Sequence, residues 1–393
     1  MKLILGNTNT KKIYLEPLWK PHSLYNSMIN NPPEGYQFVL PEDSATHMYK
    51  SLGKNNLSYS LLYQLGRGAP LNLLHSYVRK YSIPSLIPNL TYASNHLVFR
   101  DEPWIIDLEY ISLALGSGKY VKQYKKLLER SFQSPNCKKI LCWYEACKKT
   151  LNANLDCSLF ENKITVFLPY GQQRNFVKQY NREKIKLLFT GSANILGEFV
   201  IKGGAETVDA FIALNNKYDF LELVIRSDMP SETKTKLAHF DNVRIIDKII
   251  PWAELEHEFQ TADIFILPAH NTPWLAMLDA MSYELPVVTL DVWANSEIVA
   301  NGKTGLLAPK SRDLIYFDEN FTPQWDRPQF LRAIKKPDPQ VVRGLVEKIS
   351  LLIEDAQLRR AMGHAARWEV EQGKFSIRSR NEKLKQIFDE VAT

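Results

Sequence analysis

The sequence lacks the features of small disulfide-bonded, zinc-binding, secreted or membrane-spanning proteins. It has only four cysteines in 393 residues, and their spacing fits neither a zinc motif nor a disulfide framework. We therefore expect Cys137, Cys142, Cys147 and Cys157 to be reduced and buried. No apolar run approaches the roughly 18 residues of a membrane span. The apolar part of "MKLILGNTNT" is too short for a secretion signal and is more typical of a first strand, which predicts a cytoplasmic protein.

Two motifs that bind phosphate or metal are also missing. "GSGK" at 116–119 contains part of a phosphate-binding loop, but the spacing G-x-x-x-x-G-K-S/T is absent. Asp-x-Asp occurs nowhere in the chain, which argues against enzymes that hold a metal ion through that motif. We therefore predict a site that requires no metal.

The charge that is present is unevenly distributed. The chain has a net charge of +6, yet residues 1–180 carry 22 basic and 12 acidic side chains, whereas the remainder carries 27 and 31. This asymmetry predicts an anionic partner for the N-terminal half: a membrane lipid, a lipid-phosphate acceptor or nucleic acid. The chain has no nucleic-acid recognition motif, so we expect no nucleic-acid partner. The basic amphipathic stretch 119–130 fits either a peripheral membrane contact or a surface helix packed on its own domain.

From residue 184 onward, strand and helix patterns alternate at short spacing. Strands are expected at 184–191, 220–226, 242–247, 263–269 and 286–291, with helical patterns between them. This alternation predicts parallel strands with right-handed crossovers, which is a doubly wound α/β domain. Ligands of such domains bind outside the carboxyl ends of the strands, here at Gly191, Arg226, Pro268 and Asp291.

The first half has a weaker pattern of the same type. Segments 2–6, 36–42, 70–77, 103–110, 138–151 and 163–171 suggest a second alternating α/β unit. We expect an N-terminal domain over 1–171, a polar linker over 172–183 and a C-terminal domain over 184–375. Helices near 339–354 and 356–392 close the chain, and the part at about 376–393 is expected to pack back on the N-terminal domain. Two such domains place a ligand site in the cleft between them.

Four segments of the C-terminal half share a recognisable pattern: "LLFTG…KGGAETVDAF", "NVRIID…AELEHEFQTADIFILPA", "LDAMSYELPVVTLDVWANSEIVANGKTGLLAP" and the tail "LRRAMGHAARWEVEQGKFSIRSRNEKLKQIFDE". In this order they resemble family 4 of the retaining glycosyltransferases (glycosyl transferases group 1). The resemblance implies the GT-B fold, in which two Rossmann-like, doubly wound α/β domains face each other across a cleft. The N-terminal half matches loosely, mainly through "PWIIDLEY".

The resemblance also implies where the pyrophosphate of a nucleotide-sugar donor binds. Its negative charge grows as the sugar departs, so fixed positive groups and helix N-termini should meet it. Lys202 matches a family lysine and precedes Gly203 at the start of a predicted helix, whereas the family arginine position holds Ser192. Arg226, at the end of a neighbouring strand, is a candidate substitute. The alternative for Lys202 is a solvated loop lysine.

"PAHNTPWLAMLDAM" matches the donor-sugar loop of the family, which usually shows two glutamates separated by seven residues. These positions hold Asn271 and Asp279, which the resemblance assigns to the hydroxyls of the donor sugar and of the ribose. Asn271 keeps hydrogen-bonding groups but has no charge, so either the sugar choice differs or catalysis is weak. His270 is either a phosphate or sugar contact or an exposed loop residue. Thr272 is expected to cap the helix that begins at Pro273 and so to add backbone donors.

Three further carboxylates fall at predicted strand ends or helix starts. Glu297 matches a family glutamate that contacts the ribose or the base; the alternative is a carboxylate at a helix start. Asp107 and Glu109 lie in "WIIDLEY", where many members place a His or an acidic residue beside the donor, and both are expected to leave the strand on one side. We expect Glu109 to contact the reacting sugar or the acceptor, with a carboxylate without function as the alternative.

Together these features predict a cytoplasmic, metal-independent enzyme, associated with a membrane surface through its basic N-terminal domain. The resemblance implies transfer of a hexose, with retention, from a nucleoside-diphosphate sugar to a glycan or lipid-linked acceptor, without a cofactor. The missing Arg and Glu leave two alternatives. One is a non-catalytic GT-B protein acting as a partner or scaffold. The other is a sugar-nucleotide epimerase or a phosphorylase of the same fold.

Overall fold

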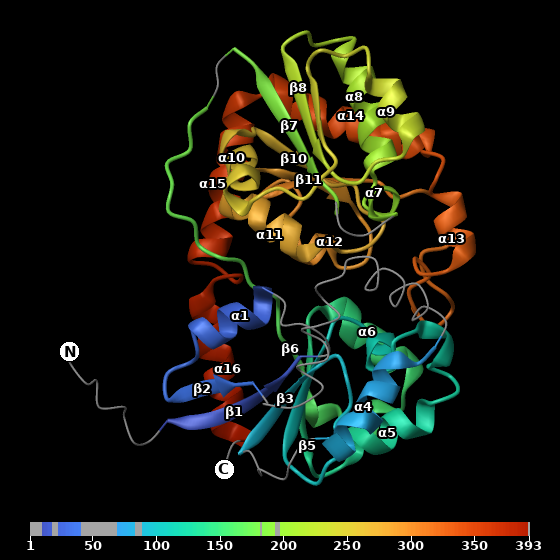
Figure 1. Ribbon diagram of the computed structural model, residues 1–393, viewed down its shortest axis with the longest axis vertical. Helices are drawn as coiled ribbons and strands as arrows, with labels where there is room; N and C mark the ends of the chain where they lie inside the picture. Colours follow the sequence, from blue (N-terminus) through green and yellow to red (C-terminus); the bar gives the residue numbers. More distant parts are fainter. Residues whose placement is uncertain are drawn as a thin grey trace, which may run out of the picture. The chain divides into compact units, whose positions relative to one another are not determined.

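The computed structural model describes residues 10–17, 23–40, 69–82, 89–180, 183–192 and 197–391. The chain divides into two units. Unit 1 comprises Met1–Pro169, Glu319–Thr322 and Ile377–Thr393, and unit 2 comprises Tyr170–Asp318 and Pro323–Ser376. Each unit is built on a six-stranded sheet flanked by helices (Figure 1).

Unit 2 is organised around a parallel sheet with the strand order β12-β11-β10-β7-β8-β9. Its strands are β7 (Ile185–Thr190), β8 (Leu221–Arg226), β9 (Val243–Ile246), β10 (Ile264–Ile266), β11 (Val287–Leu290) and β12 (Gly305–Ala308). The chain starts at β7 in the centre, winds outward through β8 and β9, and then returns to β10 on the other side. The topological switch point, where ligands of such sheets bind, therefore lies between β7 and β10.

Helices cover both faces of this sheet. They are α7 (Glu198–Ile201), α8 (Gly204–Asn215), α9 (Ser231–Leu237), α10 (Trp252–Thr261), α11 (Trp274–Ser282), α12 (Asn295–Ile298), α13 (Pro328–Ala333), α14 (Pro339–Glu354) and α15 (Ala356–Glu371). α8 packs against α14 and α11 packs against α15, and Figure 1 shows these two pairs on opposite sides of the sheet. Because both faces are covered, β10 and β11 are buried along their whole length.

Unit 1 has a parallel sheet with the order β2-β1-β3-β4-β5-β6. Its strands are β1 (Lys11–Glu16), β2 (Tyr36–Val39), β3 (Leu90–Ser94), β4 (Trp104–Leu108), β5 (Cys137–Cys142) and β6 (Ile164–Val166). Its helices are α1 (Ser23–Asn30), α4 (Leu71–Ser82), α5 (Lys125–Gln133), α6 (Glu145–Asn154) and α16 (Ile377–Val391), with 3-10 turns η1 (Ile111–Ala114), η2 (Gly118–Tyr120), η3 (Cys157–Leu159) and η4 (Glu161–Lys163). All four cysteines are free and buried, as expected.

The predicted fold class, α/β with two doubly wound parallel sheets, is confirmed. The strand expected at 2–6 lies outside the described residues, and β1 and β3 were not predicted. The single helix expected over 356–392 is wrong, because α15 and α16 are separate helices that belong to different units. The turn between them contains Gly373, where a Cβ would lie only 2.4 Å from Glu369 Oε2, so a side chain would have no room there.

The helix expected over 119–130 is also shorter than predicted, because α5 begins at Lys125. Its apolar side chains face the protein: Leu128 is part of the core of unit 1, and Tyr120, Tyr124 and Leu127 pack against that core. Only the basic side chains of this stretch, its lysines and Arg130, therefore remain to attract an anionic surface. No helix in the described ranges is both long and apolar enough to cross a bilayer.

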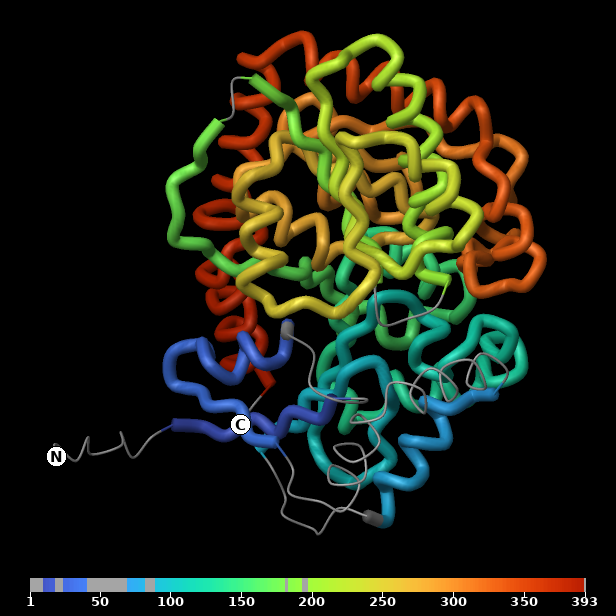
Figure 2. The backbone as a smooth tube through the Cα atoms, turned by 45° about the horizontal axis from the view of Figure 1, so that its top comes forward, coloured from blue at the N-terminus to red at the C-terminus, as the bar shows by residue number. Residues whose placement is uncertain are grey.

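Residues 170–180, expected to be part of a polar linker, form an extended segment that lies on unit 2, and we call this segment the strap (Figure 2). Every second side chain is turned toward the unit: Arg174, Phe176, Lys178 and Tyr180 are buried or half-buried, and those between them are exposed. The Phe176 ring packs 5.3 Å from that of Tyr283, and Tyr180 Oη donates to Glu284 Oε1 at 2.6 Å. The strap is thus a bound part of unit 2.

Lys178 is the most buried of these side chains and anchors the strap to the end of α10. Its Nζ donates to the carbonyls of Phe259 (3.4 Å), Gln260 (3.1 Å) and Ala262 (2.5 Å). The last carbonyls of a helix have no partner within it, so an ammonium placed there satisfies them and complements the helix dipole. Burial lowers the pKa of Lys178 to about 8.

We predict that Lys178→Met destabilises unit 2. The variant would leave buried carbonyls without a donor, which costs about 1–3 kcal/mol. Lys184→Met is the matched control, because Lys184 follows the strap but forms an exposed ion pair with Glu222 at 2.7 Å, and exposed pairs contribute little to stability. Melting temperatures measured by circular dichroism test this. Equal values for the two variants would mean that Lys178 does not anchor the strap.

Candidate functional site

The candidate site lies at the carboxyl ends of β7 and β10, on the two sides of the switch point in unit 2. The chain leaves β7 at Gly191 and Ser192, and it leaves β10 through Pro268, His270 and Asn271. Parallel strands end at the same edge of a sheet, so these two exits are neighbours.

A glycine joins the turn before α8 to the loop after β10. Gly203 has φ +75°, and a Cβ at this position would lie only 2.1 Å from the carbonyl oxygen of Pro268. His270 N donates to the carbonyl of Ile201 at 2.9 Å across the same contact. Only a glycine allows two backbones to approach this closely with this conformation. The contact therefore brings Lys202 and Gly203 to the loop that carries His270 and Asn271.

Lys202 and the first turn of α8 together form a site of positive electrostatic potential. Lys202 follows α7 directly, and its Nζ lies 3.7 Å from Glu198 Oε2, with 18% of its side chain exposed. Gly203 is the N-cap of α8, and in the part of the chain that the structure describes no side chain accepts from the amides of this helix start. An ammonium beside uncapped helix amides attracts an anion.

His270 is buried, so the alternative of an exposed loop histidine is wrong. Its side chain is 1% exposed, with Nε2 at 3.1 Å from Glu206 Oε1 and Nδ1 at 2.9 Å from Tyr316 Oη. With the proton on Nε2, His270 donates to Glu206 and accepts from Tyr316. Two buried oxygens beside this chain, Glu206 Oε2 and Asn271 Oδ1, have no hydrogen-bond partner within the described ranges. Both are acceptors, so a ligand here would have to present hydrogen-bond donors.

Arg226 lies at the edge of this arrangement, at the end of β8. Its Nη1 donates to the carbonyl of Gly191 at 3.3 Å, directly before Ser192. Burial lowers the pKa of Arg226, and no acidic group opposes that shift. Its guanidinium therefore reaches the backbone beside the position where the resemblance leads us to expect an arginine.

Thr272 does not cap the following helix, which corrects the sequence expectation. α11 begins at Trp274 with Pro273 in the N-cap position, and the side chain of Pro273 cannot accept a hydrogen bond from the helix amides. Thr272 Oγ1 instead accepts from Ala294 N at 3.2 Å. The hydroxyl therefore connects the loop after β10 to the loop after β11, and Pro273 provides no N–H for a ligand.

Asp279 and Glu297 lie on α11 and α12. Asp279 Oδ1 accepts from Arg174 Nη2 of the strap at 3.1 Å. Burial raises the pKa of Asp279 to about 6, and Arg174 acts in the opposite direction. Glu297 lies in the first turn of α12, and its carbonyl accepts from Lys374 Nζ at 2.7 Å.

In unit 1, Asp107 and Glu109 have different surroundings. Asp107 is fully buried in β4 and accepts hydrogen bonds from Tyr25 Oη (3.0 Å) and Tyr92 Oη (3.0 Å). Burial raises its pKa to about 7, although these hydroxyls act to lower it. Glu109 lies just beyond the end of β4, half-exposed, with its N–H donating to Asn95 Oδ1 at 3.2 Å. The two carboxylates therefore differ in accessibility, since Asp107 is buried and Glu109 is half-exposed.

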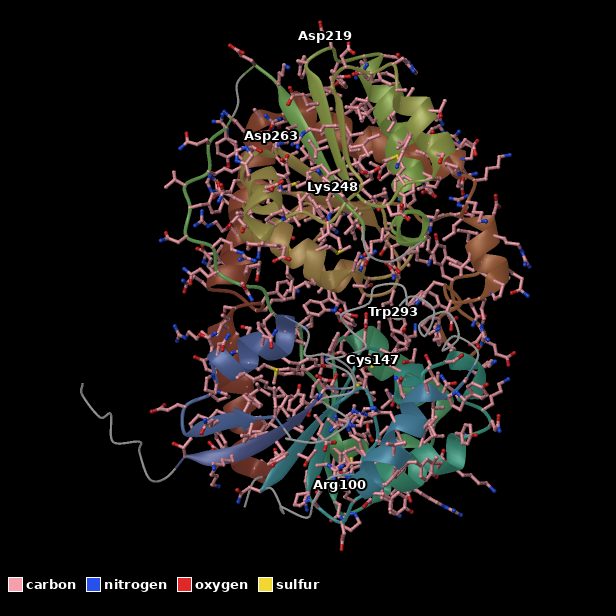
Figure 3. The ribbon with its side chains drawn as sticks, viewed as in Figure 1. Arg100, Cys147, Asp219, Lys248, Asp263 and Trp293 are labelled. Carbon is pink, nitrogen blue, oxygen red and sulfur yellow. The ribbon has the colours of Figure 1, made fainter. Side chains whose placement is uncertain are left out.

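The sequence did not indicate Trp293, which follows β11 (Figure 3). Its φ is +49°, an unfavourable conformation for a bulky residue that costs of order 1–3 kcal/mol. Its ring lies 5.5 Å from that of Phe317 and 5.6 Å from that of Trp325. The irregular segment after residue 310 thus packs around a strained residue at the same edge of the sheet.

A buried charge network in unit 1 was also missed, because β1 and β3 were not recognised. Glu16 ends β1 and accepts from Arg100 Nη2 at 2.6 Å, and its other oxygen lies 3.3 Å from His96 Nε2, after β3 (Figure 3). The network continues to Glu102, which accepts from Thr91 Oγ1 at 2.6 Å. It occupies the switch point of this sheet, between β1 and β3, with its charges paired. In the parts of the chain that the structure describes, no three His, Cys, Asp or Glu residues are grouped as potential metal ligands.

Comparison with known proteins places this site in a recognised domain. The model of the family described as glycosyl transferases group 1 matches residues 184–316, which include Lys202, Asn271 and Asp279. The capsular polysaccharide biosynthesis glycosyltransferase CapM of Staphylococcus aureus is 25% identical over 249 residues, which are 58% of this chain and 56% of CapM. The chain thus spans about half the length of this relative.

Solved structures share the fold of the whole chain. Alr3699/HepE of Anabaena, in complex with UDP, has a TM-score of 0.59 at 14% identity, covering 97% of this chain and 100% of that one. WaaG, a glycosyltransferase involved in lipopolysaccharide biosynthesis, has a TM-score of 0.55 at 14% identity, covering 96% and 99%. These likenesses confirm the predicted GT-B fold.

We predict that Gly203→Ala displaces the loop after β10. Both this variant and the control Gly302→Ala place a Cβ on a residue with positive φ, but no atom lies within 4 Å of a Cβ at Gly302. The control should therefore be destabilised only by the unfavourable backbone conformation, by about 1–2 kcal/mol. Gly203→Ala should be destabilised further, because it must also move the backbone of Pro268. Melting temperatures compare the two variants. If Gly203→Ala lowers the melting temperature no more than Gly302→Ala does, the close contact between Gly203 and Pro268 is wrong.

We also predict that Asp107 makes stability depend on pH. The folded-state pKa of about 7 lies above the usual value of 3.8, so between these values the folded chain holds a proton that the unfolded chain has lost. The free energy of unfolding should therefore fall as pH rises from about 4 to about 7, by up to about 1.4 kcal/mol per pH unit. Melting curves of wild type, Asp107→Asn and the exposed control Asp101→Asn test this. If Asp107→Asn keeps the wild-type pH dependence, the assignment is wrong.

Proposed function

We propose that the protein is a glycosyltransferase, because the model of the family described as glycosyl transferases group 1 matches residues 184–316 of unit 2. It transfers a hexose from a nucleoside-diphosphate sugar, a co-substrate rather than a cofactor, to a glycan or lipid-linked acceptor, with retention of configuration. The observation that carries this proposal is the Lys202–Gly203 turn, which presents an ammonium and helix amides at the switch point of the sheet.

The proposed chemistry requires positive groups where the leaving pyrophosphate gains charge. Lys202 and the amides of α8 supply them from one side, and Arg226 supplies a second cation through its position beside Gly191. Lys202 would exchange its present contact with Glu198 for a contact with phosphate. These fixed charges do the work that a metal ion does in other transferases, so the proposal needs no metal.

The donor sugar and the ribose would be oriented by the loop after β10 and by α11. The unpartnered Asn271 Oδ1 offers an acceptor for a sugar hydroxyl, in a loop that buried His270 and Thr272 hold in place. Asp279 would accept from the ribose hydroxyls, and Glu297 would contact the ribose or the base. Retention would follow from attack on the face that the nucleotide leaves, with the protein orienting both reactants.

Unit 1 would bind the acceptor. Glu109, half-exposed at the end of β4, is the proposed contact to the reacting sugar or to the acceptor hydroxyl. Asp107 is fully buried and cannot touch a substrate, so its proposed role changes from catalysis to holding the end of β4. The basic charge of the N-terminal half suits an acceptor phosphate or an anionic membrane surface, in keeping with relatives that act in capsule and lipopolysaccharide biosynthesis.

A non-catalytic GT-B protein is the second candidate. Two observations favour it: the uncharged Asn271 at the sugar position, and the Pro273–Trp274 helix start, which offers fewer backbone donors than expected. Nucleotide binding without turnover of any nucleotide sugar would favour this candidate over the enzyme.

Thermal stabilisation by UDP, GDP, ADP and CMP tests the proposal, and UDP comes first because solved structures of the same fold contain it. One nucleotide should raise the melting temperature by mass action. Lys202→Ala should weaken its binding about tenfold, or about 1.4 kcal/mol. The control is Lys217→Ala, because Lys217 lies just beyond the opposite end of α8 and pairs with Glu354.

The results separate the alternatives clearly. A shift by one nucleotide that is lost in Lys202→Ala but kept in Lys217→Ala would support a phosphate site at Lys202. Binding that is unaffected by Lys202→Ala would place the phosphates elsewhere. No shift with any of the four nucleotides at millimolar concentration would overturn the proposal.

A further inference from the structure

We infer that Arg174 of the strap is a positioning residue of the nucleotide site, which keeps the Asp279 carboxylate ionised and directs its free oxygen toward the ribose. This inference rests on the proposed function, because it assigns a ribose to Asp279. Arg174 is expected to act through Asp279 and not to touch the nucleotide itself.

The guanidinium of Arg174 is held rigidly. It lies over the rings of Trp252 (4.9 Å) and Tyr283 (5.3 Å), and Tyr283 Oη donates to Glu256 Oε1 at 2.6 Å. Aromatic faces attract a guanidinium and limit its orientations. Arg174 thus presents its Nη2 to Asp279 from a fixed position.

The backbone of the strap is held by hydrogen bonds from α15. Arg367 of α15 donates to the carbonyls of Arg174 and Phe176, each at 3.3 Å. Its side chain also pairs with Glu284 at 3.3 Å. Together with the Lys178 anchor, these bonds hold the strap in register, so Arg174 cannot leave Asp279 without disturbing several contacts.

Asp279 has one oxygen engaged and one available. Oδ1 accepts from Arg174 at 3.1 Å, and within the described ranges no other group bonds to the carboxylate. About 16% of each side chain is exposed, so the pair is shielded but accessible. A carboxylate with one oxygen held by a guanidinium can accept ribose hydroxyls through the other.

Burial of Asp279 disfavours its charged form, and the guanidinium of Arg174 partly offsets this effect. Burial raises the pKa of Asp279 to about 6 even with the guanidinium present. Arg174 of the strap and Tyr283 after α11 interact electrostatically with Asp279, Tyr283 Oη donates to Glu256 of α10, and Arg367 of α15 pairs with Glu284. Of these, Arg174 is the group that lowers the pKa of Asp279. Without it, protonation would move toward neutral pH, and a protonated carboxyl group is a poorer acceptor for two hydroxyls.

The test measures nucleotide affinity as a function of pH. Calorimetry with whichever of UDP, GDP, ADP and CMP binds the wild type most tightly would cover about pH 5 to about 9 for wild type, Arg174→Met, Arg174→Lys and Asp279→Asn. Wild-type binding should weaken as pH falls through about 6, because Asp279 takes up a proton. In Arg174→Met this midpoint should move upward, with affinity about tenfold lower at pH 7 and largely recovered at the highest pH.

Two further variants serve as controls. Arg174→Lys keeps the charge and should hold the midpoint close to that of wild type. Arg378→Met removes the arginine of an exposed pair with Glu382 and should change nothing. Asp279→Asn should bind weakly without this pH dependence, and adding Arg174→Met to it should cost no further affinity.

Each remaining outcome overturns the inference in a recognisable way. An unchanged midpoint in Arg174→Met, even with a lower melting temperature, would show a purely structural role. A loss of affinity that is equal at all pH values would show that Arg174 contacts the nucleotide directly. If the wild type binds none of UDP, GDP, ADP and CMP, the proposed function fails and the inference fails with it.

Discussion

The close approach of Gly203 to the carbonyl of Pro268 is the constraint on which the site depends. A parallel sheet alone places the exits of β7 and β10 side by side, but it does not bring the turn before α8 to within van der Waals contact of the loop after β10. The glycine makes that contact, and the backbone bond from His270 to Ile201 secures it. An ammonium, a helix start and a polar loop are thereby held together by backbone geometry rather than by side-chain pairing.

Around this backbone contact, burial of polar groups fixes the individual side chains. His270 is held by Glu206 and Tyr316, Asp279 by Arg174, and Arg226 by the carbonyl of Gly191. Each arrangement leaves one polar atom unused, such as Glu206 Oε2 or Asn271 Oδ1. Buried polar atoms are costly when unpaired, so a site with several of them is prepared for a ligand that supplies the missing partners.

The C-terminal unit could be predicted because its strands are continuous apolar runs separated by short helices, and that pattern directly reports a sheet covered on both faces. β1 was missed because "KKIYLE" begins and ends with charged residues, and the burial of its Glu16 depends on Arg100 and His96 far along the chain. The burial of His270 was not predicted for a similar reason, since its partners Glu206 and Tyr316 are distant in sequence. The strap alternates with period two, but its inward side chains include Arg174 and Lys178, so the pattern resembled a linker. Partners of buried charges are set by tertiary structure, and no local pattern identifies them.

The strap also determines how this protein can be divided into fragments. A fragment cut at residue 184, where the apolar pattern begins, would contain every strand of the second sheet but would lose the cation beside Asp279 and the cap of α10. A cut before Tyr170 keeps both. The first unit is less easily separated, because it takes Glu319–Thr322 and Ile377–Thr393 from distant parts of the chain. Gene fusions, truncations and domain exchanges between relatives would therefore have to respect boundaries that follow side-chain anchoring rather than the ends of the sheets.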